Sequence, residues 1–220
     1  MTLADALRVL EFLSSGTIYT LTITVVALAV GFAIGTPIAM ARVYGNKLIQ
    51  RLAVAYVVVL RGFPSLVVLF IAYYVLASLV NLPPLLAGCA ALGICSSAYQ
   101  AEIFRGAIQG VHSGQMMAAR ALGMTQRQAI IEVILPQALR NAIPGWSNEA
   151  AVVIKDSSLV YAVGLAELMR RAQQINATMR APLLIFSITG AIYFVLTFGI
   201  NRLLGWIEHL TRIPEMAEAR

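Results

Sequence analysis

The sequence predicts an all-α, polytopic membrane protein with about five transmembrane helices. Hydrophobic residues make up 60% of the 220-residue chain, and its mean hydropathy is +0.81. Charged residues make up only 12%, against roughly 25% in soluble proteins. A polar, arginine-bearing island at 114–136 separates long apolar segments, so we expect it to lie outside the lipid. Length and composition together predict a single domain that covers residues 1–220.

The first expected span covers residues 17–40, which exceeds the roughly 20 apolar residues that cross a bilayer. Gly31 and Gly35 lie four positions apart in it, a spacing that lets another helix pack closely. The second apolar region, 52–80, is interrupted at 61–64 (Arg-Gly-Phe-Pro), because proline cannot complete the helical hydrogen-bond ladder. The break is either a kink in one long helix or the end of a short helix before the true span.

The third expected span covers 85–106 and carries Glu102 and Arg105 three positions apart at its end, so that the two side chains can pair. The fourth covers 136–163 and the fifth covers 182–206. Three ionisable residues lie inside the fourth: Glu149, Lys155 and Asp156. An ionisable side chain at membrane depth is costly, so it normally faces the bundle interior or a watery cavity.

These intramembrane charges, together with Arg61, have three interpretations. They form buried ion pairs that hold the bundle together, they contact a polar solute, or they lie at a membrane boundary. Lys155 and Asp156 are neighbours and point about 100° apart on a helix, so they need not pair with each other.

The distribution of basic residues predicts the orientation. The loops after the first and third spans lie on one side and share five of them: Arg42, Lys47, Arg51, Arg120 and Arg127. Basic loops face the cytoplasm, so an odd number of spans places the N-terminus outside and the C-terminus in the cytoplasm. Three arginines then fall on the outer side, against the rule: Arg170, Arg171 and Arg180.

Several function classes are not expected. The net charge of +6 comes without a basic run interleaved with aromatics, so no nucleic-acid partner is predicted. Cys89 and Cys95 point to different faces of a helix and suit packing, and His112 and His209 are isolated, so no metal site is predicted. We find no catalytic constellation, no phosphate-binding loop and no cleavable signal peptide. The protein is therefore not expected to be an enzyme, and any energy source belongs to a partner.

Four blocks of sequence are informative when they are taken in order. They are residues 16–24 (Gly-Thr-Ile-Tyr-Thr-Leu-Thr-Ile-Thr), 61–74 (from Arg-Gly-Phe-Pro to Tyr-Tyr), 98–108 with the island 114–136, and 148–168 with its Lys-Asp-Ser-Ser-Leu. In this order they resemble the polar amino-acid branch of the ABC-importer permeases, which import histidine, arginine, glutamine and related compounds. The resemblance covers residues 16–206. Met117 is a departure, since it replaces the glutamate of the family's usual Glu-Ala-Ala loop.

The resemblance implies a type I ABC importer permease fold in the bacterial inner membrane, with residues 110–136 as a cytoplasmic coupling loop. It also implies the partners: ATPase subunits that bind ATP and Mg, a second identical or related permease subunit, an external solute-binding protein, and a small polar amino acid as substrate. The chain itself would hold no cofactor.

Within the loop, alanine and leucine favour a short helix that a positive φ at Gly123 can end. A second helix is expected from Gln126 to about Ile134, and Pro136 restarts the next span. The expected ATPase-docking residues are Gly114, Ala118, Ala119, Arg120, Ala121, Leu122, Gly123 and Pro136.

The expected substrate pathway combines the intramembrane charges with nearby polar residues: Arg61, Tyr99, Glu102, Asn148, Glu149, Lys155, Asp156, Ser157 and Ser158. A cationic substrate would favour Glu149 or Asp156 as its partner. The alternative functions are a secondary transporter, which would show internal repeats and usually more spans, and a membrane enzyme, which would need paired catalytic groups.

Overall fold

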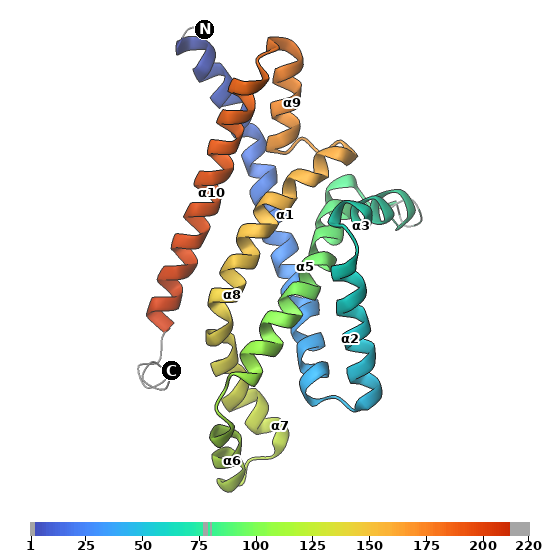
Figure 1. Cartoon of the computed structure of the whole chain (residues 1–220), viewed down its shortest axis with the longest axis vertical. Helices are drawn as coiled ribbons and strands as arrows, with labels where there is room; N and C mark the ends of the chain where they lie inside the picture. Colours follow the sequence, from blue (N-terminus) through green and yellow to red (C-terminus); the bar gives the residue numbers. More distant parts are fainter. Residues whose placement is uncertain (1–2, 77–78, 80, 212–220) are drawn as a thin grey trace.

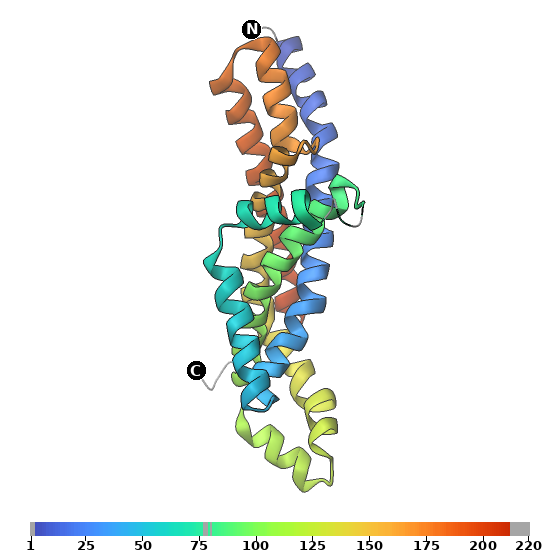
Figure 2. The same cartoon turned by 90° about the vertical axis from the view of Figure 1, so that its right-hand side faces the viewer.

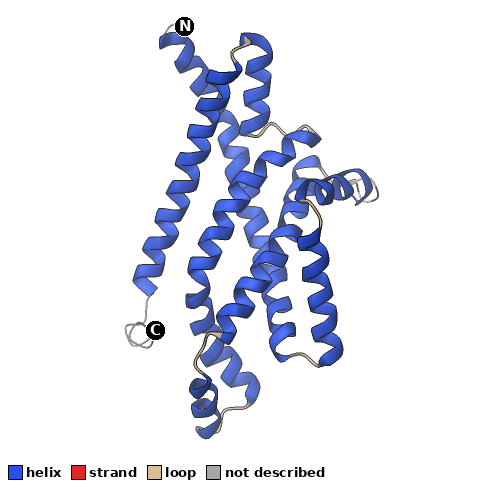
Figure 3. Ribbon diagram, viewed as in Figure 1, coloured by secondary structure: helices blue, strands red, loops and turns tan. Residues whose placement is uncertain are grey.

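The computed structural model describes residues 3–76, 79 and 81–211, and the regular structure in this part of the chain is helical (Figure 3). The longer helices run beside one long axis (Figures 1 and 2). The N-terminal residues and α9 (Leu168–Met179) lie at one end, which we call the N-terminal end. Helices α6 (Ser113–Ala121) and α7 (Gln126–Gln128) form the other, the loop end. The predicted all-α fold class is confirmed.

Helix α1 (Leu3–Tyr44) contains the first expected span and packs along α5 (Pro84–Gln109), which contains the third. The predicted close approach at the glycine pair is confirmed. A Cβ atom at Gly31 would lie 2.3 Å from Nε2 of Gln100, and one at Gly35 would lie 2.8 Å from the carbonyl oxygen of Ser97. At position 35 a side chain would push the two backbones apart, so glycine is required there. At position 31 a Cβ atom would instead displace the side-chain amide of Gln100.

The second apolar region does not form one continuous helix. Helix α2 (Lys47–Gly62) ends at Phe63, and α3 (Ser65–Ile71) continues into the π-helix η1 (Ala72–Leu76) at an angle of 102° to α2. Phe63 is extended, and Pro64 offers no N–H to continue the ladder. The expectation of one long kinked helix is wrong, because α3 and η1 turn across the long axis of the bundle (Figure 2). The alternative, a short helix before the true span, stays a prediction.

The fourth and fifth regions form α8 (Leu135–Asp156) and α10 (Pro182–Thr211). Helix α8 stops before the expected end, since the next residues form the 3-10 helix η3 (Ser157–Val163), which ends at Gly164 with φ 86°. Helix α9 was not predicted. Its apolar residues recur at every third or fourth position, but polar residues lie between them and the segment is not apolar overall.

By length and composition, two of the described helices, Leu7–Tyr44 and Pro182–Thr211, are able to cross a membrane, and the bent α2–α3 pair would make three. Helices α5 and α8 are less apolar than these two, because both carry charged residues: Glu102 and Arg105 in α5, and Arg140, Glu149, Lys155 and Asp156 in α8. The count of five spans therefore stays a prediction.

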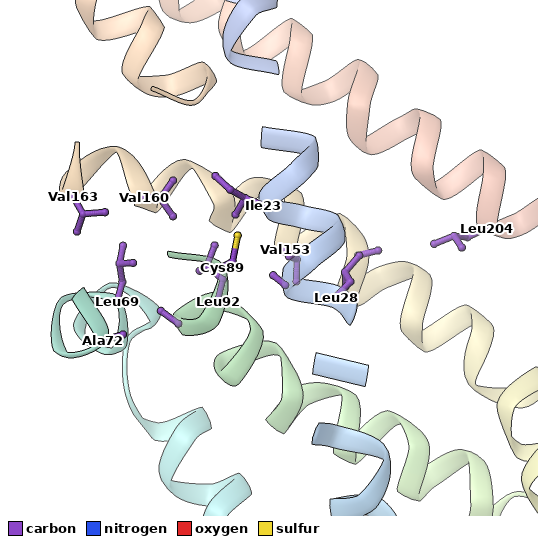
Figure 4. Close-up of a cluster of buried hydrophobic side chains, with 13 residues drawn as sticks. Ile23, Leu28, Leu69, Ala72, Cys89, Leu92, Val153, Val160, Val163 and Leu204 are labelled. Carbon is purple, nitrogen blue, oxygen red and sulfur yellow. The ribbon is translucent and has the colours of Figure 1, made fainter. Parts of the chain in front are cut away.

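A buried apolar cluster joins α3 and η1 to the long helices (Figure 4). Leu69 of α3 and Ala72 of η1 lie against residues of four further helices and η3, which include Ile23, Leu28, Cys89, Leu92, Val153, Val160, Val163 and Leu204. Cys89 belongs to this cluster as a free, buried thiol, in agreement with its expected packing role. The cluster holds α3 beside α5 and α8.

Candidate functional site: a central cavity and a coupling loop

The loop forms a helix–glycine–helix turn, as predicted. The His112 Nδ1 accepts a hydrogen bond from the Gly114 N–H (3.1 Å) and caps α6. At the other end, Gly123 has φ 87°, and the N–H of Met124 donates to the Ala119 carbonyl (3.2 Å). Arg120 crosses the turn and donates to the Met124 carbonyl (2.7 Å). A positive φ just after the last helical turn is the usual way in which a helix ends before a sharp reversal.

The return segment has a cap of its own. The Gln128 N–H donates to the Thr125 hydroxyl (3.2 Å), and the Thr125 N–H donates to the Gln128 side chain (2.9 Å), which forms a capping box. Helix α7 then continues through the π-helix η2 (Ala129–Ile134) directly into α8, with Pro136 in its first turn. The predicted return helix is confirmed, and the Thr-x-x-Gln pattern that caps it was visible in the sequence.

Most of the expected docking residues lie on the surface of this turn. Ala119 is the exception, because it is buried and supports the turn from inside. Gly114 is half-buried, and the exposed members are Ala118, Arg120, Ala121, Leu122, Gly123 and Pro136. Met117 and Leu122 are large apolar side chains with 66% and 83% of their surface exposed. The turn therefore presents apolar and small side chains at the surface of the loop end.

A cavity of about 210 Å³ lies between α3, α5 and α8. Its lining combines apolar side chains with six polar ones and a thiol: Ser65, Leu92, Cys95, Ser96, Tyr99, Asn148, Glu149, Val152, Val153 and Asp156. Glu149 and Asp156 are seven positions apart on α8, two helical turns, so they lie on the same face. The cavity therefore has two carboxylates on one wall.

Hydrogen bonds from the other helices orient both carboxylates. The Ser96 hydroxyl of α5 donates to Glu149 (2.7 Å), and the Ser65 hydroxyl of α3 donates weakly to Asp156 (3.4 Å). Glu149 is 6% exposed, which makes it the most deeply buried charge of the cavity wall. Because burial without a partner is costly, these hydroxyls lower the cost of keeping the carboxylates there.

A buried glutamine supports Ser96 from behind. The Gln100 amide donates to the Ser96 hydroxyl (3.0 Å) and to the Leu28 carbonyl (3.2 Å), and it accepts from the Trp146 indole (2.7 Å). Gln100 thus connects α1, α5 and α8 in one polar network that ends at Glu149. Ser65, Ser96 and Gln100 were not predicted from the sequence, although a polar residue inside an apolar span is itself an indication of such a network.

Arg61 reaches the same region from the end of α2. Its guanidinium lies 5.0 Å from the centre of the Tyr99 ring, and Tyr99 lines the cavity. This distance is typical of a cation–π contact. The predicted pathway residues Arg61, Tyr99, Asn148, Glu149 and Asp156 therefore come together at one place.

The other four predicted pathway residues lie outside the cavity. Glu102 pairs with Arg42 of α1 and, as predicted, with Arg105 (2.8 Å). Ser157 is buried and donates to the Ile154 carbonyl (2.7 Å). Ser158 and Lys155 do not line the cavity, and Lys155 is exposed and forms no ion pair within the described part of the chain. The helical rotation that brings Glu149 and Asp156 inward turns Lys155 outward.

The described residues contain no group of three side chains suited to hold a metal ion. The sequence profile of one family, "Binding-protein-dependent transport system inner membrane component", matches residues 28–213. The chain belongs to this family. It is thus a membrane component of a transport system that works with a binding protein, and its relatives are permease subunits rather than ATPases.

Among its relatives, the nopaline transport system permease protein NocM of Agrobacterium fabrum is 36% identical over 195 residues, which cover 84% of this chain and 81% of that protein. The glutamine transport system permease protein GlnP of Escherichia coli is 35% identical over 207 residues, 93% of this chain and 94% of that protein.

Solved structures of ABC transporters agree with this family assignment. An amino acid ABC transporter solved with histidines has a chain that superposes with a TM-score of 0.84 at 38% identity, covering 95% of this permease and 98% of that chain. The MetNI methionine ABC transporter, at 21% identity, also gives a TM-score of 0.84 and supports the fold alone. The type I ABC importer permease fold is therefore confirmed.

Proposed function

We propose that this permease carries polar amino acids through the membrane and binds them in the cavity between α3, α5 and α8. The main support for this proposal is the pair of carboxylates, Glu149 and Asp156, on one wall of a cavity inside an otherwise apolar bundle. Charges at membrane depth mark solute pathways when they face an interior cavity rather than one another. The relatives, which transport nopaline and glutamine, support a substrate of this chemical class.

The charges of the cavity favour a substrate with a cationic side chain. Neither carboxylate forms an ion pair among the described residues, so each is available to an ammonium or guanidinium group. Arg61, held against Tyr99 at the edge of the same region, is suited to the substrate's carboxylate. Asn148 and the two serines add neutral hydrogen-bonding groups.

The loop and the cavity are parts of one continuous structure, which suggests how transport is driven. ATPase subunits, which bind ATP and Mg in place of any cofactor in this chain, would seat against the exposed turn around Gly123. The return segment runs without interruption into α8, and α8 carries Asn148, Glu149 and Asp156 about 20–30 Å further along. Movement of the turn therefore moves one wall of the cavity. Closed ATPases would favour the state that is open to the outside.

A functional transporter requires a second permease subunit, identical or related, so that a pathway forms between two bundles. The exposed apolar faces of α2 and α10 leave ample surface for lipid or such a subunit. In this arrangement an external solute-binding protein delivers the substrate to the N-terminal end.

Reconstitution tests the function. Purified permease with co-expressed ATPase subunits, placed in proteoliposomes, should take up labelled arginine or histidine only with internal ATP and an external loaded binding protein. Unlabelled glutamate should compete poorly, because its second carboxylate meets Glu149 and Asp156. Uptake by the permease alone, without ATPase or ATP, would instead identify a secondary transporter.

The orientation has a separate test. In a background with Cys89→Ala and Cys95→Ala, cysteines replacing the exposed Glu11 and Gln126 are treated with an impermeant thiol reagent in intact cells. We expect labelling at position 11 and protection at position 126, because the arginine-rich loops face the cytoplasm. The reverse pattern would overturn the orientation, and labelling of both sites after cell lysis is the control for accessibility.

A further inference from the structure

The three arginines that violate the positive-inside rule belong to α9 and its end. Figure 1 places α9 at the N-terminal end, at the opposite end of the molecule from the coupling loop. Arg170 and Arg171 lie in the first turn, and Arg180 follows the last turn. Transport through the central cavity does not account for these charges, so they need another explanation.

Helix α9 is amphipathic and turns its apolar side toward the bundle. Leu168 and Ala172 are fully buried, with Ile175 and Met179 packed against the same cluster, which includes Val9, Leu13 and Ile185. The opposite side carries Arg170, Gln174, Thr178 and Arg180, which we call the α9 polar face. Gln174, Thr178 and Arg180 are exposed, and Arg170 is partly so.

The α9 polar face is cationic and forms no ion pair with an acidic side chain in the part of the chain that the structure describes. Helix α9 contains no carboxylate. The ion pairs formed among the described residues, Arg42 and Arg105 with Glu102, involve neither Arg170 nor Arg180. Arg171 differs from them, because its guanidinium lies 5.0 Å from the centre of the Phe12 ring and its Nη1 contacts Gln174. Arg171 therefore stabilises the packing of α9 on α1, whereas Arg170 and Arg180 remain available.

A buried acid holds this face rigidly. Glu167 is fully buried and accepts hydrogen bonds from the backbone N–H groups of Met169 (2.8 Å) and Arg170 (2.7 Å), which caps α9. It also accepts from the Tyr193 hydroxyl of α10 (2.8 Å). The Leu168 N–H donates to the Thr20 hydroxyl of α1 (3.3 Å). These hydrogen bonds fix the start of α9 to both α1 and α10.

We propose that the α9 polar face is the docking surface for an acidic patch on the external solute-binding protein, an inference that rests on the proposed function. Arginine, amide and hydroxyl groups on a rigid helix match a polar protein rim, where charge complementarity sets the association rate and the register. Anionic lipid is the weaker match. A helix that lies in a membrane surface turns large apolar side chains toward the lipid, whereas α9 turns its own toward the bundle.

The test uses the reconstituted complex and the purified binding protein that stimulates wild-type ATP hydrolysis. The double variant Arg170→Glu/Arg180→Glu should raise the concentration of binding protein needed for half-maximal stimulation by about tenfold or more, because like charges then face each other. Assembly and basal ATP hydrolysis should stay unchanged. Arg170→Lys/Arg180→Lys is the matched control and should remain close to wild type. Added salt should weaken stimulation of the wild type more than that of the Glu variant, since it screens the attraction.

Three results would count against the proposal, in different ways. Normal stimulation of the Glu variant at low salt would overturn the docking surface and leave the proposed function intact. A defect that appears in phosphatidylglycerol vesicles and disappears in phosphatidylcholine vesicles would identify the arginines as a lipid contact instead. Failure of every binding protein to stimulate the wild-type complex would reject the proposed function itself, and the docking surface with it.

Discussion

Gly123→Val should abolish coupled transport while leaving the permease inserted in the membrane. Gly123 has φ 87°, a region that costs an L-residue about 1–2 kcal/mol and a β-branched residue more. A Cβ atom there would meet nothing within 4 Å, so the penalty comes from the backbone alone. Relief of that penalty requires the turn between α6 and α7 to change shape, which displaces the surface that faces the ATPase.

Two measurements check this expectation: uptake into proteoliposomes and the stimulation of ATP hydrolysis by substrate-loaded binding protein. Both should fall to near background, while the amount of membrane-inserted permease stays normal. Gly123→Asn is the matched control, because asparagine tolerates positive φ, and it should retain most of the activity. Gly123→Ala should fall between the two. Wild-type uptake in the valine variant would refute a coupling role for the turn.

Replacing either cavity carboxylate should weaken substrate-dependent activity more than assembly. Asp156→Asn and Glu149→Gln preserve size and the hydrogen bonds from Ser65 and Ser96, yet remove the negative charge that faces the cavity. A hydrogen bond to a charged group contributes about 1.5–3 kcal/mol. We therefore expect about a 10- to 100-fold rise in the arginine concentration needed for half-maximal uptake, with a smaller rise for glutamine.

Lys155→Met separates a cavity role from a packing role. Lys155 was expected among the buried charges, but its side chain is exposed and lies outside the cavity. It should therefore change arginine selectivity little. If instead the carboxylate variants yield little assembled complex in detergent, the two acids hold the bundle together. Unchanged selectivity with normal assembly in both carboxylate variants would reject the cavity as the binding site.

Features that depend on local chemistry could be predicted from the residues alone. Runs of apolar residues predicted where helices form, because a backbone in lipid must satisfy its own hydrogen bonds. Spacing alone predicted the close packing at Gly31 and Gly35 and the pair between Glu102 and Arg105. Gly123 was predicted to end a helix because few other residues adopt its backbone conformation.

Which polar groups share a cavity became clear only from the packing of the helices. Ser65, Ser96 and Glu149 come from three helices, and their meeting depends on the 102° turn after α2 and on the rotation of α5 and α8. The same rotation turned Lys155 outward, and Arg42 of α1 drew Glu102 into an ion pair away from the cavity. Helix α9 became evident only with the cluster that buries its apolar side. Helix rotation and crossing are set by side-chain packing between segments far apart in sequence, which no local pattern encodes.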